Sequence, residues 1–117
     1  MDSTGGGDTM RTLKFIVDGQ ILRQDPTCDF SNIVPGTEGY LRAEFAFSQE
    51  WDRTVKLVSF TRGNKEFTPQ VLKDNKSCTI PSEALKWRIF QLKVIGRRSD
   101  FKIITNKIAV LQDGGQT

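Results

Sequence analysis

The sequence predicts an all-β protein, an antiparallel β-sandwich of about seven to nine short strands with one short helical turn. Two observations favour this class. Apolar residues recur at every second position in short runs rich in Val, Ile, Phe and Thr, and turn residues separate these runs at short intervals. Local hairpins combined with one long irregular loop, Asp25 to Gly39, fit two packed sheets better than a closed barrel.

Length and composition indicate one domain. The chain has 117 residues, of which 37% are hydrophobic, and this is enough apolar surface for one modest core but not for two. We expect a flexible tail over residues 1–10, because its first nine residues are mostly Gly, Ser, Thr and Asp. The sandwich should then span residues 11–112, with a flexible end over 113–117.

Strands can be placed by their alternation and by the turns between them. The clearest alternation is that of Tyr40 to Phe47, which predicts a strand with one buried face. One face would carry Leu41, Ala43, Phe45 and Phe47, and the other Tyr40, Arg42 and Glu44. Further strands are expected at residues 13–17, 20–24, 55–61, 65–72, 77–80, 89–95 and, as one or two strands, 101–111. The helical turn is expected at Pro81 to Leu85, because proline suits the first position of a helix.

The charge is unevenly divided along the chain. Residues 1–52 carry 4 Lys and Arg against 9 Asp and Glu, a net −5, whereas residues 53–117 carry 13 against 5, a net +8. Many of the basic residues flank Trp87 and Phe101, namely Lys86, Arg88, Lys93, Arg97, Arg98, Lys102 and Lys107. Nucleic-acid binding is therefore one alternative, although the same alternation is expected of a solvated strand face.

Few residues of the sequence point to catalysis or to a metal. The chain has no histidine, so the commonest general base and the Ser-His and Cys-His systems are excluded. Glu50 and Asp52 flank Trp51 as the one tight acidic pair, and we interpret them as turn residues rather than as glycosidase carboxylates. We predict no enzymatic activity, no cofactor and no metal.

Two cysteines, Cys28 and Cys78, are far apart in the sequence and form no Cys-x-x-Cys motif. We expect two free thiols, because Cys78 lies in an apolar strand pattern where cysteine behaves as a small hydrophobe. The sequence shows no signal peptide and no run long enough for a membrane helix, so synthesis in a cytoplasm and no membrane contact are expected.

Four residues are candidates for contact with a partner: Trp51, Trp87, Arg97 and Arg98. Each tryptophan lies at the boundary of a predicted element beside charged residues, where it can cap the core or anchor an interface. Arg97-Arg98 begins a predicted polar turn, Arg97 to Asp100, whose charge would suit an acidic patch.

A succession of motifs between Leu41 and Val110 resembles a known family. The first motifs are a strand ending in Phe-Ala-Phe-Ser, then Gln49-Glu50-Trp51-Asp52, then Val55-Lys56 and a following Phe60. After them come Ser77 to Leu85 (SCTIPSEAL), Val94-Ile95-Gly96 and Ile104-Thr105-Asn106-Lys107. Their order is similar to an immunoglobulin-like module of tail, baseplate and head-fibre proteins in phages of Firmicutes and related gut bacteria.

The resemblance implies an immunoglobulin-like fold and a structural role in the virion, after synthesis in the host bacterial cytoplasm. The partners would be other virion proteins of the capsid, tail or baseplate, or further copies of the chain in a homo-oligomer. A carbohydrate-binding or host-surface-binding domain and the basic nucleic-acid-binding domain are the two alternatives.

Overall fold

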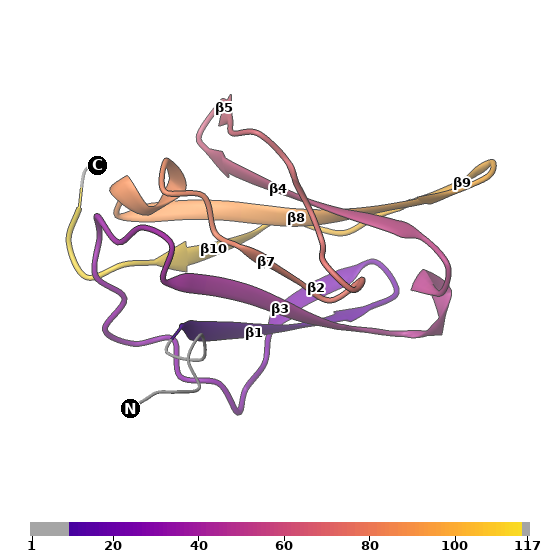
Figure 1. Ribbon diagram of the computed structural model, residues 1–117, viewed down its shortest axis with the longest axis horizontal. Helices are drawn as coiled ribbons and strands as arrows, with labels where there is room; N and C mark the ends of the chain where they lie inside the picture. The colour runs from indigo at the N-terminus through magenta and orange to yellow at the C-terminus, as the bar shows by residue number, and fades with distance from the viewer. Residues whose placement is uncertain (1–9, 116–117) are drawn as a thin grey trace.

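The computed structural model describes residues 10–115, in which two β-sheets pack face to face as a sandwich (Figure 1). Sheet A has the strand order β2-β1-β3-β7 and contains β1 (Arg11–Asp18), β2 (Ile21–Gln24), β3 (Leu41–Phe47) and β7 (Ser77–Thr79). Sheet B has the order β10-β8-β4-β5, with β6 paired to β4 and β9 to β8. Its strands are β4 (Val55–Arg62), β5 (Lys65–Glu66), β6 (Gln70–Val71), β8 (Ile89–Arg98), β9 (Phe101–Ile104) and β10 (Ile108–Leu111). The predicted all-β sandwich is confirmed.

The described residues contain ten strands rather than seven to nine, because one predicted strand is split. Residues 65–72 were expected to be continuous, but Pro69, which has no N–H to donate, lies between β5 and β6. The predicted helical turn is observed as η2 (Ala84–Lys86), and a second one, η1 (Gln49–Trp51), was not predicted. All ten strands lie within the expected domain.

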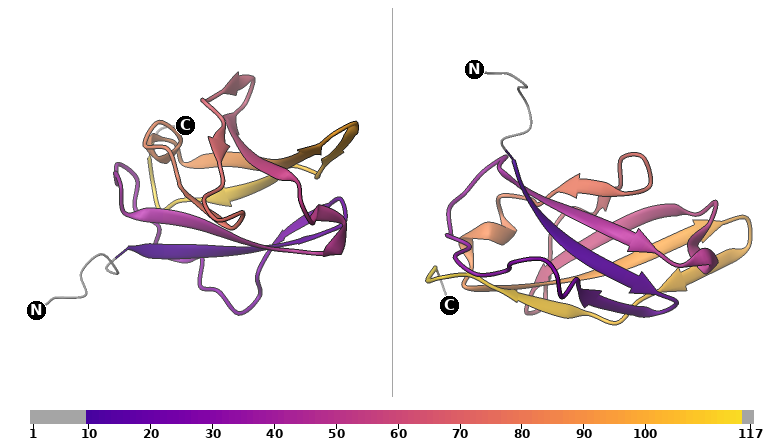
Figure 2. Two further views of the ribbon diagram at one scale, coloured as in Figure 1. Left: turned by 45° about the vertical axis from the view of Figure 1, so that its right-hand side comes forward. Right: turned by 90° about the horizontal axis from the view of Figure 1, so that it is seen from below.

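One strand pair differs from the antiparallel expectation. Strand β3 runs parallel to β1, with Leu13 beside Ala43 and Phe15 beside Phe45. The hairpin β1–β2 and the long loop that follows return the chain to the start of β1, so β3 runs in the same direction as β1 (Figure 2). The pairing aligns the buried faces of both strands, and the rings of Phe15 and Phe45 stack with centroids 5.2 Å apart.

The short helix η1 connects sheet A to sheet B at one end of the sandwich (Figure 1). Its last residue, Trp51, is buried and closes the core at this end. Its indole Nε1 donates a hydrogen bond of 2.7 Å to the carbonyl oxygen of Gly19, in the β1–β2 turn of sheet A. Its ring packs against Phe47 at 5.2 Å and against Gly96 of β8 in sheet B. A Cβ atom on Gly96 would lie 2.7 Å from the indole ring, so only glycine fits at this position of β8.

This close approach predicts the effect of Gly96→Ala. The methyl group would overlap the Trp51 ring, and overpacking of this kind lowers the free energy of unfolding by about 1–3 kcal/mol. We expect a correspondingly lower urea midpoint with an unchanged slope. In a Trp51→Leu background, where the ring is absent, the same substitution should cost clearly less. Equal costs in both backgrounds would contradict the steric explanation.

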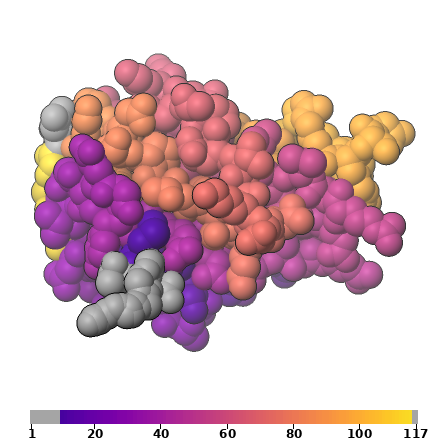
Figure 3. All heavy atoms as spheres, viewed as in Figure 1, coloured from indigo at the N-terminus to yellow at the C-terminus, as the bar shows by residue number. Residues whose placement is uncertain are grey.

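The long loop between β2 and β3 is fixed to both sheets. The Arg11 guanidinium of β1 donates hydrogen bonds to the carbonyl oxygens of Asp29, Ser31 and Asn32. Ile33 is buried in the core, and its carbonyl accepts a hydrogen bond from the backbone N–H of Asp113. The purple loop atoms lie at the surface next to the orange η2 segment (Figure 3). The loop thus closes a side of the core as well as presenting a surface.

Those contacts also bear on the predicted termini. The tail expected over residues 1–10 lies outside the described residues except for Met10. The end segment 113–117 is described as far as Gly115, and within it Asp113 is held to the loop by its backbone hydrogen bond.

Asn106 joins the two sheets at the corner between β9 and β10. Its side-chain amide accepts a hydrogen bond from the backbone N–H of Leu22 (2.7 Å) and donates one to the carbonyl of the same residue (3.2 Å). The amide therefore pairs with β2 as a neighbouring strand would. The preceding residue, Thr105, occupies the break in the ladder, where its hydroxyl accepts a hydrogen bond from the N–H of Val94.

Both cysteines are free thiols, as predicted. Cys78 is buried in sheet A beside Ala43, and this burial raises the pKa of its thiol to about 12. Cys28 is half-buried at the edge of β1, where its Sγ accepts a hydrogen bond from the Lys14 N–H. An unfolded thiol ionises near pH 9.0, so Cys78 should favour the folded state at neutral pH and lose this contribution as the pH rises from 9.0 towards 12.

We therefore expect the two thiols to react differently. At pH 8 an alkylating reagent should modify Cys28 in the native protein, whereas Cys78 should react only in denaturant, because its thiolate is scarce and its sulfur is buried. Mass spectrometry of digested protein distinguishes the two sites, and a Cys28→Ser variant is the control. Rapid native modification of Cys78 would contradict its placement in the core.

Candidate functional site

The four residues predicted to contact a partner do not form one site. Trp87 lies two residues before the first residue of β8, whereas Arg97 and Arg98 are the last two residues of that strand. A strand rises about 3.3 Å per residue, so the ten positions from Trp87 to Arg97 span about 33 Å. Trp51 is 0% exposed, which corrects its assignment as a partner anchor and favours its other predicted role as the cap of the core.

Arg97 and Arg98 also have different environments. The predicted polar turn Arg97 to Asp100 is shorter than expected, because β8 includes both arginines and the turn is formed by Ser99 and Asp100. The guanidinium of Arg98 donates a hydrogen bond of 2.6 Å to the carbonyl of Asp52 and lies 4.4 Å from the centroid of the Phe101 ring. Arg97 is exposed and lies opposite Lys102 in β9.

Because the environments of Arg97 and Arg98 differ, their substitution by alanine should lower the free energy of unfolding by different amounts. Arg98→Ala should lower the free energy of unfolding by about 1 kcal/mol, because it removes one hydrogen bond and one cation–π contact. Arg97→Ala is the matched control and should stay within about 0.5 kcal/mol of wild type. Chemical denaturation of both variants measures the difference, and an equal cost would refute the structural role of Arg98.

The outer face of sheet B carries a row of aliphatic side chains that the sequence analysis did not identify. The register aligns Val71 of β6 with Leu57 of β4, Leu57 with Ile95 of β8, and Ile95 with Ile104 of β9. Cross-strand partners point to the same face, so the four side chains lie side by side across four strands. We call them the aliphatic row. Val71 is 60% exposed and the other three are half-buried.

Basic residues border the aliphatic row on the same face. Val55, which precedes Leu57 by two residues in β4, is 60% exposed and lies opposite Arg97. Arg97 in turn lies opposite Lys102. On the other side of the row, Lys93 lies opposite Ser59. The nearby carboxylate of Glu66 accepts a hydrogen bond from the Ser59 hydroxyl. We call this surface the basic-apolar face. It consists of the aliphatic row together with Val55, Lys93, Arg97 and Lys102.

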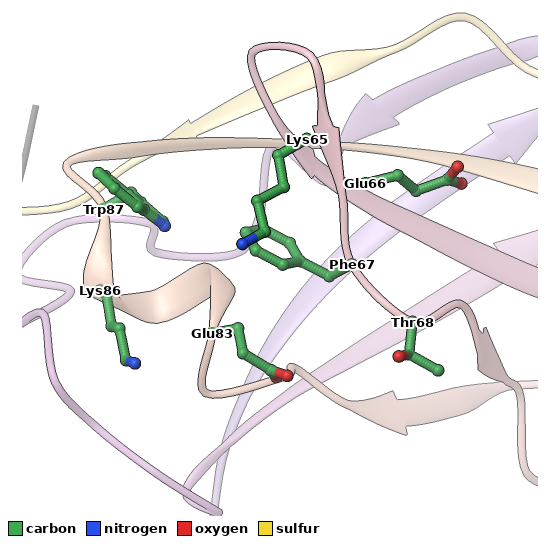
Figure 4. A pocket seen from close by; sticks show the side chains of 7 residues that line it. All are labelled: Lys65, Glu66, Phe67, Thr68, Glu83, Lys86 and Trp87. Carbon is green, nitrogen blue, oxygen red and sulfur yellow. The ribbon is translucent and has the colours of Figure 1, made fainter.

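A pocket lies at the other end of sheet B, between η2 and the β5–β6 segment (Figure 4). It has a volume of about 290 Å³ and is lined by Lys65, Glu66, Phe67, Thr68, Glu83, Lys86 and Trp87. The Arg62 guanidinium lies 4.0 Å from the centroid of the Trp87 ring, and the Lys65 ammonium lies 6.0 Å from that of Phe67. Gln112 fixes the backbone here by donating hydrogen bonds to the carbonyls of Leu85 and Trp87.

The acidic pair beside Trp51 is placed in and after η1, with both side chains exposed. A hydrogen bond from Ser48 holds the pKa of the Glu50 carboxyl below its usual value, whereas a glycosidase acid needs a raised pKa. In residues 10–115 no group of His, Cys, Asp and Glu side chains is arranged to hold a metal ion. No helix in this part of the chain has the length and hydropathy needed to cross a membrane.

Neither protein-family models nor curated proteins nor solved structures give a match to this chain.

Proposed function

We propose that this chain is a non-catalytic attachment module that docks onto another protein through the basic-apolar face. The observation that carries the proposal is the aliphatic row, whose four side chains lie together on an outer sheet face with Val71 60% exposed. A contiguous apolar surface with a polar rim is typical of a protein interface.

The charges on this face favour a partner over a second copy of the chain. A two-fold dimer would bring the same surface of both subunits together and place Lys93, Arg97 and Lys102 near their own copies. Repulsion among these cations would oppose such a dimer. A partner with an apolar patch rimmed by carboxylates would be complementary in both respects.

The motif resemblance supports a virion protein as that partner, so we propose attachment to the capsid, tail or baseplate of a phage particle. The same motifs have structural roles in this fold: Trp51 caps the core, Gly96 contacts its ring, and Asn106 joins the sheets. The basic-apolar face lies outside these motifs except for Val55, Ile95 and Ile104.

Nucleic-acid binding is less well supported by the geometry. The basic residues of the C-terminal third are spread along β8 and β9 with the aliphatic row among them, and the Trp87 ring is already in contact with Arg62. Base-stacking sites instead combine exposed aromatic rings with a continuous basic groove.

The test is co-sedimentation of the purified chain with phage heads and, separately, with tails that lack it. Val71→Asp places a carboxylate at the exposed end of the row and should weaken binding at least about tenfold. Val34→Asp is the matched control, because Val34 is 61% exposed on the β2–β3 loop, and it should bind as wild type does.

Unchanged binding of Val71→Asp would rule out this face as the docking surface. If neither particle fraction binds the chain, the virion proposal fails. Steeply salt-dependent binding to any DNA would favour the nucleic-acid alternative instead.

A further inference from the structure

The pocket beside Trp87 brings together two groups that can only donate hydrogen bonds. In Figure 4 the indole nitrogen of Trp87 points towards the Lys65 ammonium, which lies over the Phe67 ring. An indole N–H and an ammonium have no acceptor capacity, so neither can satisfy the other. Within residues 10–115 neither group has a protein acceptor. The space between them therefore suits an anionic acceptor.

The carboxylates that line the pocket do not fill this role. Glu66 accepts a hydrogen bond from Ser59, and Figure 4 shows its carboxylate directed away from Trp87. Glu83 lies at the η2 side of the pocket with its carboxylate directed away from Trp87, and among the described residues it forms no ion pair with Lys65 or Lys86. Among residues 10–115, the lysines that line this pocket therefore have no carboxylate partner, and they lie beside its aromatic rings.

We propose that this pocket binds one acidic sugar unit of a polysaccharide. A carboxylate on the sugar would accept hydrogen bonds from Trp87 and Lys65. Lys86 lines the η2 side of the pocket, with its ammonium directed away from Trp87 (Figure 4). The hydroxyls of the sugar ring would reach Thr68 and Glu83. The volume of about 290 Å³ is at the small end of ligand pockets and suits a single ring.

Glu83 distinguishes a sugar from an acidic peptide. Its carboxylate can accept hydrogen bonds from sugar hydroxyls, whereas it would repel the second carboxylate of a peptide that is rich in Asp and Glu. The proposed site is independent of the basic-apolar face, because none of its lining residues belongs to that face.

The test is a titration of the ¹⁵N-labelled full chain with tetragalacturonate, followed by NMR. The chain has two tryptophans, and each gives one indole N–H signal. The Trp87 signal should move and saturate, while the Trp51 signal, from a buried indole bonded to Gly19, should stay in place. Neutral galactotetraose and tetraglutamate should each bind at least about tenfold more weakly.

A pair of lysine substitutions tests the assignment of the site. Lys65→Gln should weaken tetragalacturonate binding about tenfold by removing a charge-assisted hydrogen bond. Lys102→Gln makes the same charge change on the basic-apolar face and should alter the affinity less than about twofold. Both lysines are exposed, so both variants should fold.

Three results would overturn the proposal. They are an unmoved Trp87 signal, equal affinity for tetraglutamate, and an equal loss of affinity in Lys102→Gln, which would indicate attraction by net charge alone. None of these results concerns docking through the basic-apolar face, which Val71→Asp tests. The sugar-binding proposal and the attachment role can therefore fail separately.

Discussion

The packing of Trp51 against Gly96 is the contact on which the arrangement of the two sheets depends. The indole is hydrogen-bonded to a turn of sheet A and is in contact with a strand of sheet B, so it fixes the distance between the sheets at this end. With Gly96 directed inward, alternation along β8 directs Ile95 and Arg97 outward. The alternation of β8 that places Gly96 against Trp51 therefore also places the apolar Ile95 and the basic Arg97 on the outer face.

Local alternation was sufficient to predict the core but not the topology. The buried side chains of β3, Leu41, Ala43 and Phe45, follow directly from their spacing, as does the burial of Cys78. The parallel pairing of β1 with β3 could not be predicted, because the direction of a strand depends on the path of a long loop that carries no regular pattern.

The candidate sites were harder to predict for a related reason. A binding face consists of residues from several strands in register, such as Val71, Leu57, Ile95 and Ile104, and register is invisible in a single sequence. One signal in the sequence could have indicated an apolar outer face. Val58 and Phe60 of β4 are buried, and Val55 and Leu57, which are also apolar, occupy the alternate positions that point to the other face. Trp87 was identified from its charged neighbours, but its partners Lys65 and Phe67 come from another hairpin.

The parallel pair also has a consequence for how the chain acquires its structure during synthesis. Strand β1 is complete at Asp18, yet β3, which pairs with it and shares its buried face, ends only at Phe47. The short helix η1, which closes that end of the sandwich, ends at Trp51. Contacts between residues so distant in sequence form slowly, because the intervening chain must first be ordered. The apolar side chains of β1 therefore stay exposed to water until β3 and the strands of sheet B have left the ribosome. During this stage of synthesis the chain is most prone to aggregate, and chaperone binding would have its largest effect.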